Sequence, residues 1–345
     1  MAGRRGGSRR PTIADIAARA GVSSGAVSYA LNGRPGVSDD TRARILEVAR
    51  EAGWVPSAAA RALTGVGSAT VGLVITREPA VLGIEPFFMA FVAGIEEVLS
   101  ERGYALLLQV TPRPDQEVQT YRAWWSAGRV DGIFLTDLRS QDRRLPLLGE
   151  IGLPAVAVGD PSAAGDLPAV WSDDAHAAVE AVERLAALGH RRMAHVTGPA
   201  ELVHTQVRSA AMREACAERG LEPLVEVRTD YTLDSGAGAT RALLEASRRP
   251  TAIVFDNDLT ALAGVRVAEE LGLRVPGDVS VIAWDDSPLC RLTNPPLSAL
   301  SRDVSAYGAA AARVLLDLVR DGVAASDRSS VPALVDRGSI APPPI

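Results

Sequence analysis

The stretch TIADIAARAGVSSGAVSYALNG, residues 12–33, has the pattern of two short helices separated at one glycine. Thr12 is placed to cap the first helix, because Asp15 follows three residues later and apolar residues recur behind it at helical spacing. Gly21 can adopt the unusual backbone angles of a tight turn. Two helices joined in this way form either a helix-turn-helix that reads DNA or a plain corner of a small helical core.

The residues around this turn predict a core of three helices. Ser23 is placed to cap the second helix, whose inner face carries Val27 and Leu31. Ser38 is placed to cap a third helix, whose apolar face begins at Ile45. The outer face of the second helix has no Arg, Lys or Gln. If this helix reads DNA, it does so with short side chains.

The charge is distributed unevenly along the chain. Residues 1–64 contain ten Arg and five acidic residues, whereas the remainder contains 26 Arg and 37 acidic residues. A basic head on an acidic body indicates that the head meets a polyanion such as DNA. A disordered basic tail is the simpler explanation for the run GRRGGSRR at 3–10, but the other six Arg of the head follow helical periodicity.

The composition sets further limits. Apolar residues make up 47% of the 345 residues and charged residues 23%, as in ordinary globular proteins. Apolar runs such as VGLVI are far shorter than the roughly 20 residues that span a membrane, and no apolar secretory signal stands at the N-terminus. Cys216 and Cys290 form no CxxC motif. We therefore expect a cytoplasmic protein without metal, cofactor or disulfide.

Strands and helices alternate through the rest of the chain. Candidate buried strands lie at 71–76, 104–110, 130–136, 154–159, 192–198, 224–229, 251–256 and 279–284, with helical stretches such as FMAFVAGIEEVLSERG between them. This alternation favours parallel sheets with helices on both faces. About 270 residues is large for one such sheet, so we expect two lobes. Ligands of such sheets lie at the carboxyl ends of the strands.

Specific motifs strengthen the DNA-binding interpretation. T-x-x-D-I-A, AGVS, VS-x-x-LNG, VS-x-x-TR and P-x-x-x-AR-x-L occur in order within residues 12–63. Further motifs are PFF (86–88), VDG (130–132), LGHRRM (188–193), VPGDVSV (275–281) and PPLSAL (295–300). With these motifs the chain resembles the LacI/GalR family of bacterial transcription regulators over nearly its whole length.

The resemblance implies how the head would meet DNA. The second helix would enter the major groove with Ser24, Gly25, Ala26 and Tyr29 toward the bases, and Thr12, Ser23, Ser28, Asn32, Ser38 and Thr41 match positions that touch phosphates. Phosphate contacts fix the register without reading sequence. The segment after WVP matches the family's hinge helix, with Ala60 and Arg61 beside Leu63, the leucine that wedges into the minor groove. A core leucine is the alternative for Leu63.

The resemblance also implies an effector site. The body resembles periplasmic sugar-binding proteins, with two lobes, three crossovers and a cleft between the lobes. Family ligand positions match Phe87, Phe88, Asp160, His204, Arg208, Tyr231, Asn257 and Asp285. Arg, Asn and Asp offer forked hydrogen bonds to vicinal hydroxyls, and an aromatic ring packs on the C–H face of a sugar. We therefore expect a small polar effector, a sugar or a related metabolite.

Several of these positions have alternative interpretations. One of the two phenylalanines is expected in the core. Asn257 and Asp285 follow strands, where capping of a turn is a fair alternative. His204 is equally well explained as a solvated loop residue. For Arg208 a surface position is the alternative, but its match to a family ligand position favours the site.

Departures from the family pattern limit what can be transferred. Many relatives carry a long polar side chain where Gly25 stands, Arg where Tyr29 stands and Asn where Ser57 stands. The operator sequence therefore cannot be copied from a relative. Relatives often carry Asp at the position of Gly159, so either Asp160 replaces it or one hydroxyl contact is lost.

The predicted fold is an all-α helix-turn-helix headpiece followed by an α/β, periplasmic-binding-protein-like core of two doubly wound lobes. Residues 1–11 would form a basic tail, 12–56 the headpiece, 57–68 the hinge helix and linker, and 69–345 the core. The N-lobe would comprise about 69–166 and 297–324, and the C-lobe about 167–296 and 325–345.

Two other classes of protein fit the sequence less well. An enzyme on a doubly wound fold lacks support, because GxGxxG after the first strand, a P-loop, HExxH and a GxSxG that follows a predicted strand are all missing from the sequence. A pure sugar-binding module would not need the headpiece. The sequence therefore predicts a homodimeric repressor without catalytic residues, whose partners are operator DNA and a sugar effector, with no membrane association.

Overall fold

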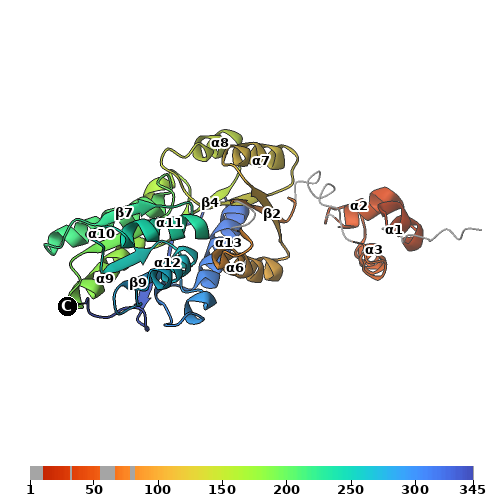
Figure 1. Cartoon of the computed structure of the whole chain (residues 1–345). Coiled ribbons are helices and arrows are strands. Elements are labelled where there is room, and N and C mark those ends of the chain that lie inside the picture. Colours follow the sequence, from red (N-terminus) through yellow and green to blue (C-terminus); the bar gives the residue numbers. More distant parts are fainter. Residues whose placement is uncertain (1–10, 32, 55–66, 78–81, 345) are drawn as a thin grey trace, which may run out of the picture. The chain divides into compact units, whose positions relative to one another are not determined.

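The computed structural model describes residues 11–31, 33–54, 67–77 and 82–344 (Figure 1). Its contacts divide the chain into two units, residues 1–68 and residues 69–345, which are taken in turn. The predicted basic tail and most of the predicted hinge segment, with Ala60, Arg61 and Leu63, lie outside the described residues, and so does Asn32.

The first unit consists of helices α1 (Ile13–Ala20), α2 (Ser24–Leu31) and α3 (Asp39–Glu51). Thr12 Oγ1 accepts a hydrogen bond from the Asp15 amide at 3.3 Å, and the Asp15 carboxylate accepts one from the Thr12 amide at 2.7 Å. This reciprocal capping box confirms the predicted start of α1. Gly21 ends α1 with φ of +66°. Ser23 Oγ accepts from the Ala26 amide at 3.1 Å, which fixes the start of α2.

Small side chains bring the three helices together. Ile16, Val27 and Ile45 are fully buried, one from each helix. The buried alanines Ala17, Ala20, Ala30 and Ala49 surround them and allow close approach. Leu31, predicted on the inner face of α2, is only half-buried. The fold of this unit is therefore set by branched residues at the centre of an alanine-rich interface.

The second unit contains two six-stranded sheets. The first has the order β11-β5-β4-β3-β1-β2 and is wholly parallel. Its strands are β1 (Thr70–Thr76), β2 (Ala105–Thr111), β3 (Gly132–Leu135), β4 (Ala155–Val158), β5 (Ala169–Ser172) and β11 (Asp327–Ser330). Helices α6 (Pro86–Arg102) and α13 (Val304–Asp321) cover one face, and α7 (Asp115–Ser126) and α8 (Arg144–Ile151) cover the other.

The second sheet has the order β12-β10-β9-β8-β6-β7, and only the pairing of β10 with β12 is antiparallel. Its strands are β6 (Met193–Thr197), β7 (Val225–Arg228), β8 (Ala252–Phe255), β9 (Ser280–Trp284), β10 (Ser298–Ser301) and β12 (Ala333–Val335). Helices α9 (Asp174–Ala187) and α10 (Val203–Glu218) cover one face, and α11 (Leu233–Leu244) and α12 (Asp258–Glu270) cover the other. The predicted fold class, with two doubly wound lobes, is confirmed.

Helices α6 and α13 lie side by side although some 200 residues separate them in sequence (Figure 1). A Cβ added at Gly94 would lie 1.8 Å from the carbonyl oxygen of Ser305, and one at Gly308 would lie 2.1 Å from that of Phe91. The two helices therefore touch backbone to backbone, which only glycine permits at these positions.

All eight predicted strands are present, but the predicted lobe limits are wrong by one short strand at each crossover. β5 and β11 belong to the first sheet, although both were assigned to the C-lobe, and β10 belongs to the second sheet, although it was assigned to the N-lobe. The chain passes between the lobes after each of these strands. All three are four residues long. β10 and β11 lack an apolar run and β5 has only three apolar residues, which did not mark them as members of the sheet they leave.

Candidate functional site

The predicted phosphate-contacting residues of the headpiece lie at or near the starts of its helices. Thr12 precedes α1, Ser23 precedes α2, and Ser38 precedes α3, where Ser38 Oγ accepts from the Thr41 amide at 3.4 Å and donates to Thr41 Oγ1 at 2.9 Å. Ser28 lies further along α2 and is half-buried. Helix N-termini present unpaired N–H groups and favour anions, so this arrangement suits phosphate oxygens.

The outer face of α2 presents small side chains. Ser24 and Gly25 are exposed, and a Cβ added at Gly25 would meet only Ser23 Oγ, at 3.8 Å. Ala26 is half-buried. Tyr29 is 46% exposed, but its ring is 3.3 Å from where a Cβ on Gly36 would stand. The tyrosine ring therefore lies against the loop after α2.

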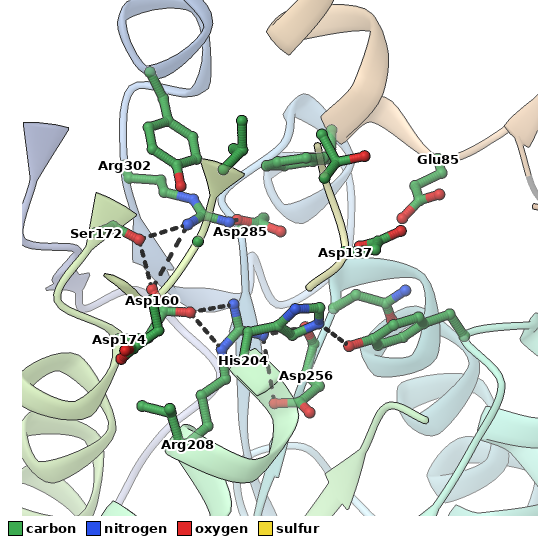
Figure 2. A pocket seen from close by; sticks show the side chains of 18 of the residues that line it. Glu85, Asp137, Asp160, Ser172, Asp174, His204, Arg208, Asp256, Asp285 and Arg302 are labelled. Atoms are coloured by element: carbon green, nitrogen blue, oxygen red, sulfur yellow. Dashed lines mark hydrogen bonds and ion pairs between the residues drawn. The ribbon is translucent and has the colours of Figure 1, made fainter. Parts of the chain in front are cut away.

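A cavity of about 770 Å³ opens where the carboxyl ends of both sheets face each other in the second unit. Residues from the first lobe and residues from the second line it together (Figure 2). Glu85 and Asp137 lie on one side, while Ser172, Asp174 and Arg302 lie on the other.

Seven of the eight predicted effector residues line this cavity, namely Phe87, Asp160, His204, Arg208, Tyr231, Asn257 and Asp285. Phe88 does not, and its prediction as a ligand residue is corrected. It is 1% exposed and packs in the core of the first lobe. Successive residues of a helix point about 100° apart, so of two neighbours in α6 only one can face the cavity.

Arg208 on α10 is held by carboxylates from two elements. Its Nε and one terminal nitrogen lie 2.8 and 2.7 Å from the Asp174 carboxylate, and Nη1 donates to the backbone oxygen of Asp256 at 3.1 Å. The guanidinium lies 3.7 Å from the centroid of the Trp284 ring. Arg208 is only 3% exposed, so it is a site residue and not a surface residue.

Arg302, which follows β10, was not predicted. Its Nη1 donates to Ser172 Oγ at 2.8 Å, and its Nη2 lies 3.2 Å from the Asp285 carboxylate. The guanidinium stands 5.2 Å from the centroid of the Phe87 ring and 5.4 Å from that of Tyr307. Arg302 thereby joins the end of β5 in one sheet to the end of β9 in the other.

Arg77, which follows β1, was also not predicted. Its Nη1 lies 2.5 Å from the Asp137 carboxylate, and its Nε lies 3.1 Å from that of Glu85. Burial raises the pKa of Glu85 to about 7, and the neighbouring Asp137 and Asp285 carboxylates add to the rise against the opposing effect of Arg77. Near neutral pH the Glu85 carboxyl is therefore a mixture of its protonated and ionised forms.

His204 and Tyr231 form a neutral pair. The His204 ring Nε2 lies 2.8 Å from the Tyr231 hydroxyl, and the two rings are stacked. Burial, assisted by the Arg208 charge, lowers the pKa of His204 to about 4. Burial also raises the pKa of Tyr231. His204 is thus an uncharged residue of the cavity wall, and the alternative of a solvated loop histidine is wrong.

Two predicted residues serve as helix caps as well as lining the cavity. Asn257 Oδ1 accepts from the Thr260 amide at 2.9 Å and starts α12, while Nδ2 is buried without a hydrogen-bond partner among the described residues. Asp160 accepts from the Ser162 amide at 2.8 Å and starts the 3₁₀ turn η1 (Pro161–Ala163). In each residue, capping therefore fixes one side-chain oxygen and leaves the other polar side-chain atom for a ligand.

The residues that the sequence interpretation missed share one signal. Arg77, Asp137, Asp256 and Arg302 are polar residues within two positions of the end of a parallel strand, as is the correctly predicted Asp285. Asp256 is the immediate neighbour of Asn257 and is held by His195 Nε2 at 2.9 Å and by the Gly198 amide at 2.8 Å. Scanning the ends of the eight predicted strands for polar residues would have found Arg77, Asp137 and Asp256, but not Arg302, because β10 was not among those strands.

Known protein families match parts of both units. The family described as "Bacterial regulatory proteins, lacI family" matches residues 12–57, and a "Periplasmic binding protein-like domain" matches residues 182–340. The HTH-type transcriptional regulator CelR of Thermobifida fusca is 35% identical over 316 residues, 90% of this chain and 92% of CelR. The chain belongs to the LacI family. It is therefore a DNA-binding transcriptional regulator.

Solved structures of LacI-family members superimpose on the whole chain. A complex of the transcriptional regulator CelR with cellobiose has a TM-score of 0.71 at 32% identity and covers 96% of this chain and 100% of that one. The lac repressor dimer bound to operator and the anti-inducer ONPF has a TM-score of 0.81 at 25% identity, with coverage of 96% and 100%.

The described part of the chain shows no sign of a membrane span or a metal site. No helix there is long and apolar enough to cross a membrane. Within the same residues, His, Cys, Asp and Glu nowhere gather in a group of three or more that could hold a metal ion. Cys216 and Cys290 are both buried and free. Neither matched family description names a catalytic activity.

Proposed function

We propose that this LacI-family regulator is a homodimeric repressor whose affinity for its operator is controlled by a sugar bound between the two lobes. The observation that carries the proposal is the cavity at the facing strand ends, because both lobes supply its polar lining. A ligand that bonds to both lobes at once stabilises one relative orientation of them over the others. Such a ligand is suited to act as an effector.

The chemistry of the lining favours a polyhydroxyl ligand. Arg208, Asn257 and Asp285 present forked or paired donors and acceptors, and Phe87 supplies an aromatic face. The CelR structure contains cellobiose, which supports a sugar as the class of effector. The lac repressor structure is a dimer on its operator, which supports the same assembly here.

The headpiece is proposed to bind operator DNA, in the cytoplasm, through the residues that the sequence singled out. Ser24 and Gly25 are exposed on α2 and are available to base edges, with Ala26 and Tyr29 beside them. Thr12, Ser23, Ser28, Ser38 and Thr41 would contact phosphates, together with Asn32. Ala60, Arg61 and Leu63 would act at the minor groove. Phosphate contacts release counterions, so binding should weaken steeply as salt rises.

Mobility-shift titration of the full chain on promoter fragments from its own genome tests the proposal. We expect one fragment to be bound far more tightly than the rest, and a sugar from a panel to release it. Release and not enhancement distinguishes a repressor relieved by inducer from one that needs a co-repressor. Chromatography of each incubated sugar should return it unchanged, whereas turnover would revive the enzyme alternative.

A further inference from the structure

The cavity carries an excess of negative charge. Six carboxyl groups line it, those of Glu85, Asp137, Asp160, Asp174, Asp256 and Asp285, against three guanidiniums. Glu85 is protonated in part near neutral pH, and the other five still outnumber the guanidiniums. His195 lies behind Asp256, with Nε2 2.9 Å from Oδ1, and offsets part of that carboxylate's charge. His204 adds no positive charge, because its buried ring is neutral at physiological pH. The lining therefore remains negative when all its ion pairs are counted.

The three guanidiniums are already engaged by these carboxylates. Arg77 lies between Glu85 and Asp137, at 3.1 and 2.5 Å. Arg208 is held by Asp174 at 2.7 Å. Arg302 contacts the carboxylate of Asp285 at 3.2 Å and that of Asp174 at 3.6 Å. An anionic ligand would have to compete with these carboxylates for the guanidiniums, apart from Arg302 Nε.

The polar atoms that make no hydrogen bond match hydroxyl groups. Nδ2 of Asn257, a residue only 6% exposed, and Nε of Arg302 are donors without a hydrogen-bond partner in the described structure. Oδ1 of Asp285 lies in an ion pair 3.2 Å from Arg302 Nη2 but accepts no hydrogen bond there. A hydroxyl both donates and accepts, so neighbouring hydroxyls can satisfy all three atoms. An ionised phosphate or carboxylate group only accepts hydrogen bonds. It would donate none to the Asp285 oxygen and would be repelled by the negative charge of that carboxylate.

We propose that the cavity selects an uncharged, hydroxyl-rich ligand and rejects anionic ones such as sugar phosphates and sugar acids. The inference rests on the proposed function, since it concerns the same effector site. It separates this chain from any regulator that senses a phosphorylated or acidic sugar. The discrimination arises from buried carboxylates that outnumber their arginine partners.

Isothermal titration of the full chain with matched sugars tests the inference. The probes are a broad panel of neutral mono- and disaccharides, including glucose, maltose and cellobiose, each beside its 6-phosphate or aldonic acid. We expect at least one neutral sugar to bind, and its anionic counterpart to bind roughly 100-fold more weakly or not at all. Equal or tighter binding of the anionic counterpart would overturn the charge inference while leaving the effector site intact. Absence of binding across the whole panel would instead overturn the proposed sugar effector, and the inference with it.

A pair of charge variants separates the local effect from net charge. Asp160→Asn keeps an oxygen for the Ser162 amide and removes one carboxylate from the cavity. We expect it to improve the affinity for the anionic sugar relative to the neutral one by roughly tenfold. Asp166→Asn makes the same change of charge at an exposed position outside the lining and should leave the ratio unchanged. Equal ratios for both variants and the unaltered chain would contradict the inference.

Discussion

Nη1 of Arg302 lies 2.8 Å from Oγ of Ser172, although the two residues follow or end strands of different sheets. The same guanidinium contacts the carboxylates of Asp174 and Asp285. The Arg302 side chain, which is 8% exposed, thus connects both lobes within the lining of the cavity. Buried charges held in this way depend on each other, because removing one leaves the others unpaired in a poorly solvated place.

Arg302→Leu should therefore destabilise the protein strongly. The change leaves Asp174 and Asp285 without one of their cations, and a broken buried ion pair typically costs about 3–5 kcal/mol. Urea unfolding followed by circular dichroism measures the loss. Arg320→Leu is the control, because Arg320 pairs with Asp317 and Asp321 on the surface, and its unfolding midpoint should stay close to that of the unaltered chain. Similar losses for the two variants would contradict this account of Arg302.

Glu85→Gln should change how stability depends on pH. Burial raises the pKa of Glu85 from 4.5 to about 7, so the folded state holds this proton more tightly than the unfolded state. The stabilisation from that proton is complete below pH 4.5 and is lost as pH rises through 7, by roughly 3 kcal/mol in all.

Glutamine cannot ionise, so the variant should lose none of this stabilisation. The groups facing Glu85 are Arg77, Asp137 and Asp285, and they remain in place. Urea midpoints measured at pH 5, 6, 7 and 8 should show the variant gaining on the unaltered chain as pH rises. Parallel curves would mean that Glu85 ionises as it does in the unfolded chain.

Gly94→Ala should disturb the contact of α6 with α13. The added methyl would meet the Ser305 carbonyl oxygen at 1.8 Å, so one helix must shift, at a cost of about 1–3 kcal/mol or more. Gly149→Ala is the matched control, because Gly149 lies within α8 and a Cβ there meets nothing within 4 Å. That variant should gain about 0.5–1 kcal/mol from helix propensity. Thermal denaturation should show midpoint shifts of opposite sign.

Leu63→Ala should weaken operator binding more than Ser24→Ala does. The outer face of α2 offers a bare glycine and short hydroxyl side chains, so we expect more specificity from DNA shape at the hinge than from side-chain forks on bases. Mobility shifts on the operator and on variants of its central step measure both losses. A larger loss for Ser24→Ala would refute the expected division of labour.

The elements that are determined by short-range sequence patterns were predictable. Thr12 and Asp15 form the expected capping box, and eight strands lie where apolar runs predicted them, although the edge strands β2 and β7 are not buried as predicted. Which of Phe87 and Phe88 faces the cavity depends on the rotation of α6 against β1, and packing at Gly94 and Gly308 helps to set it. The sequence around the two phenylalanines does not predict that rotation.

The charged floor of the cavity was not predictable for a different reason. Arg302 follows β10, a strand without an apolar run, so its position at a strand end was hidden. Its partner Ser172 is more than a hundred residues away in sequence, and its partner Asp285 belongs to the end of another strand. Ion pairs of this kind are assembled by topology and have no local spacing that can be recognised.

The three crossovers have a mechanical consequence. The chain passes between the lobes directly after Ser172, Ser301 and Ser330, through segments of one or two residues. Any rotation of one lobe against the other must be absorbed by the backbone dihedrals there. Asp174 and Arg302 stand at two of these points and also line the cavity. A ligand that touches them therefore acts where the chain crosses between the lobes, and a small displacement at this point becomes a larger one at the far ends of both lobes.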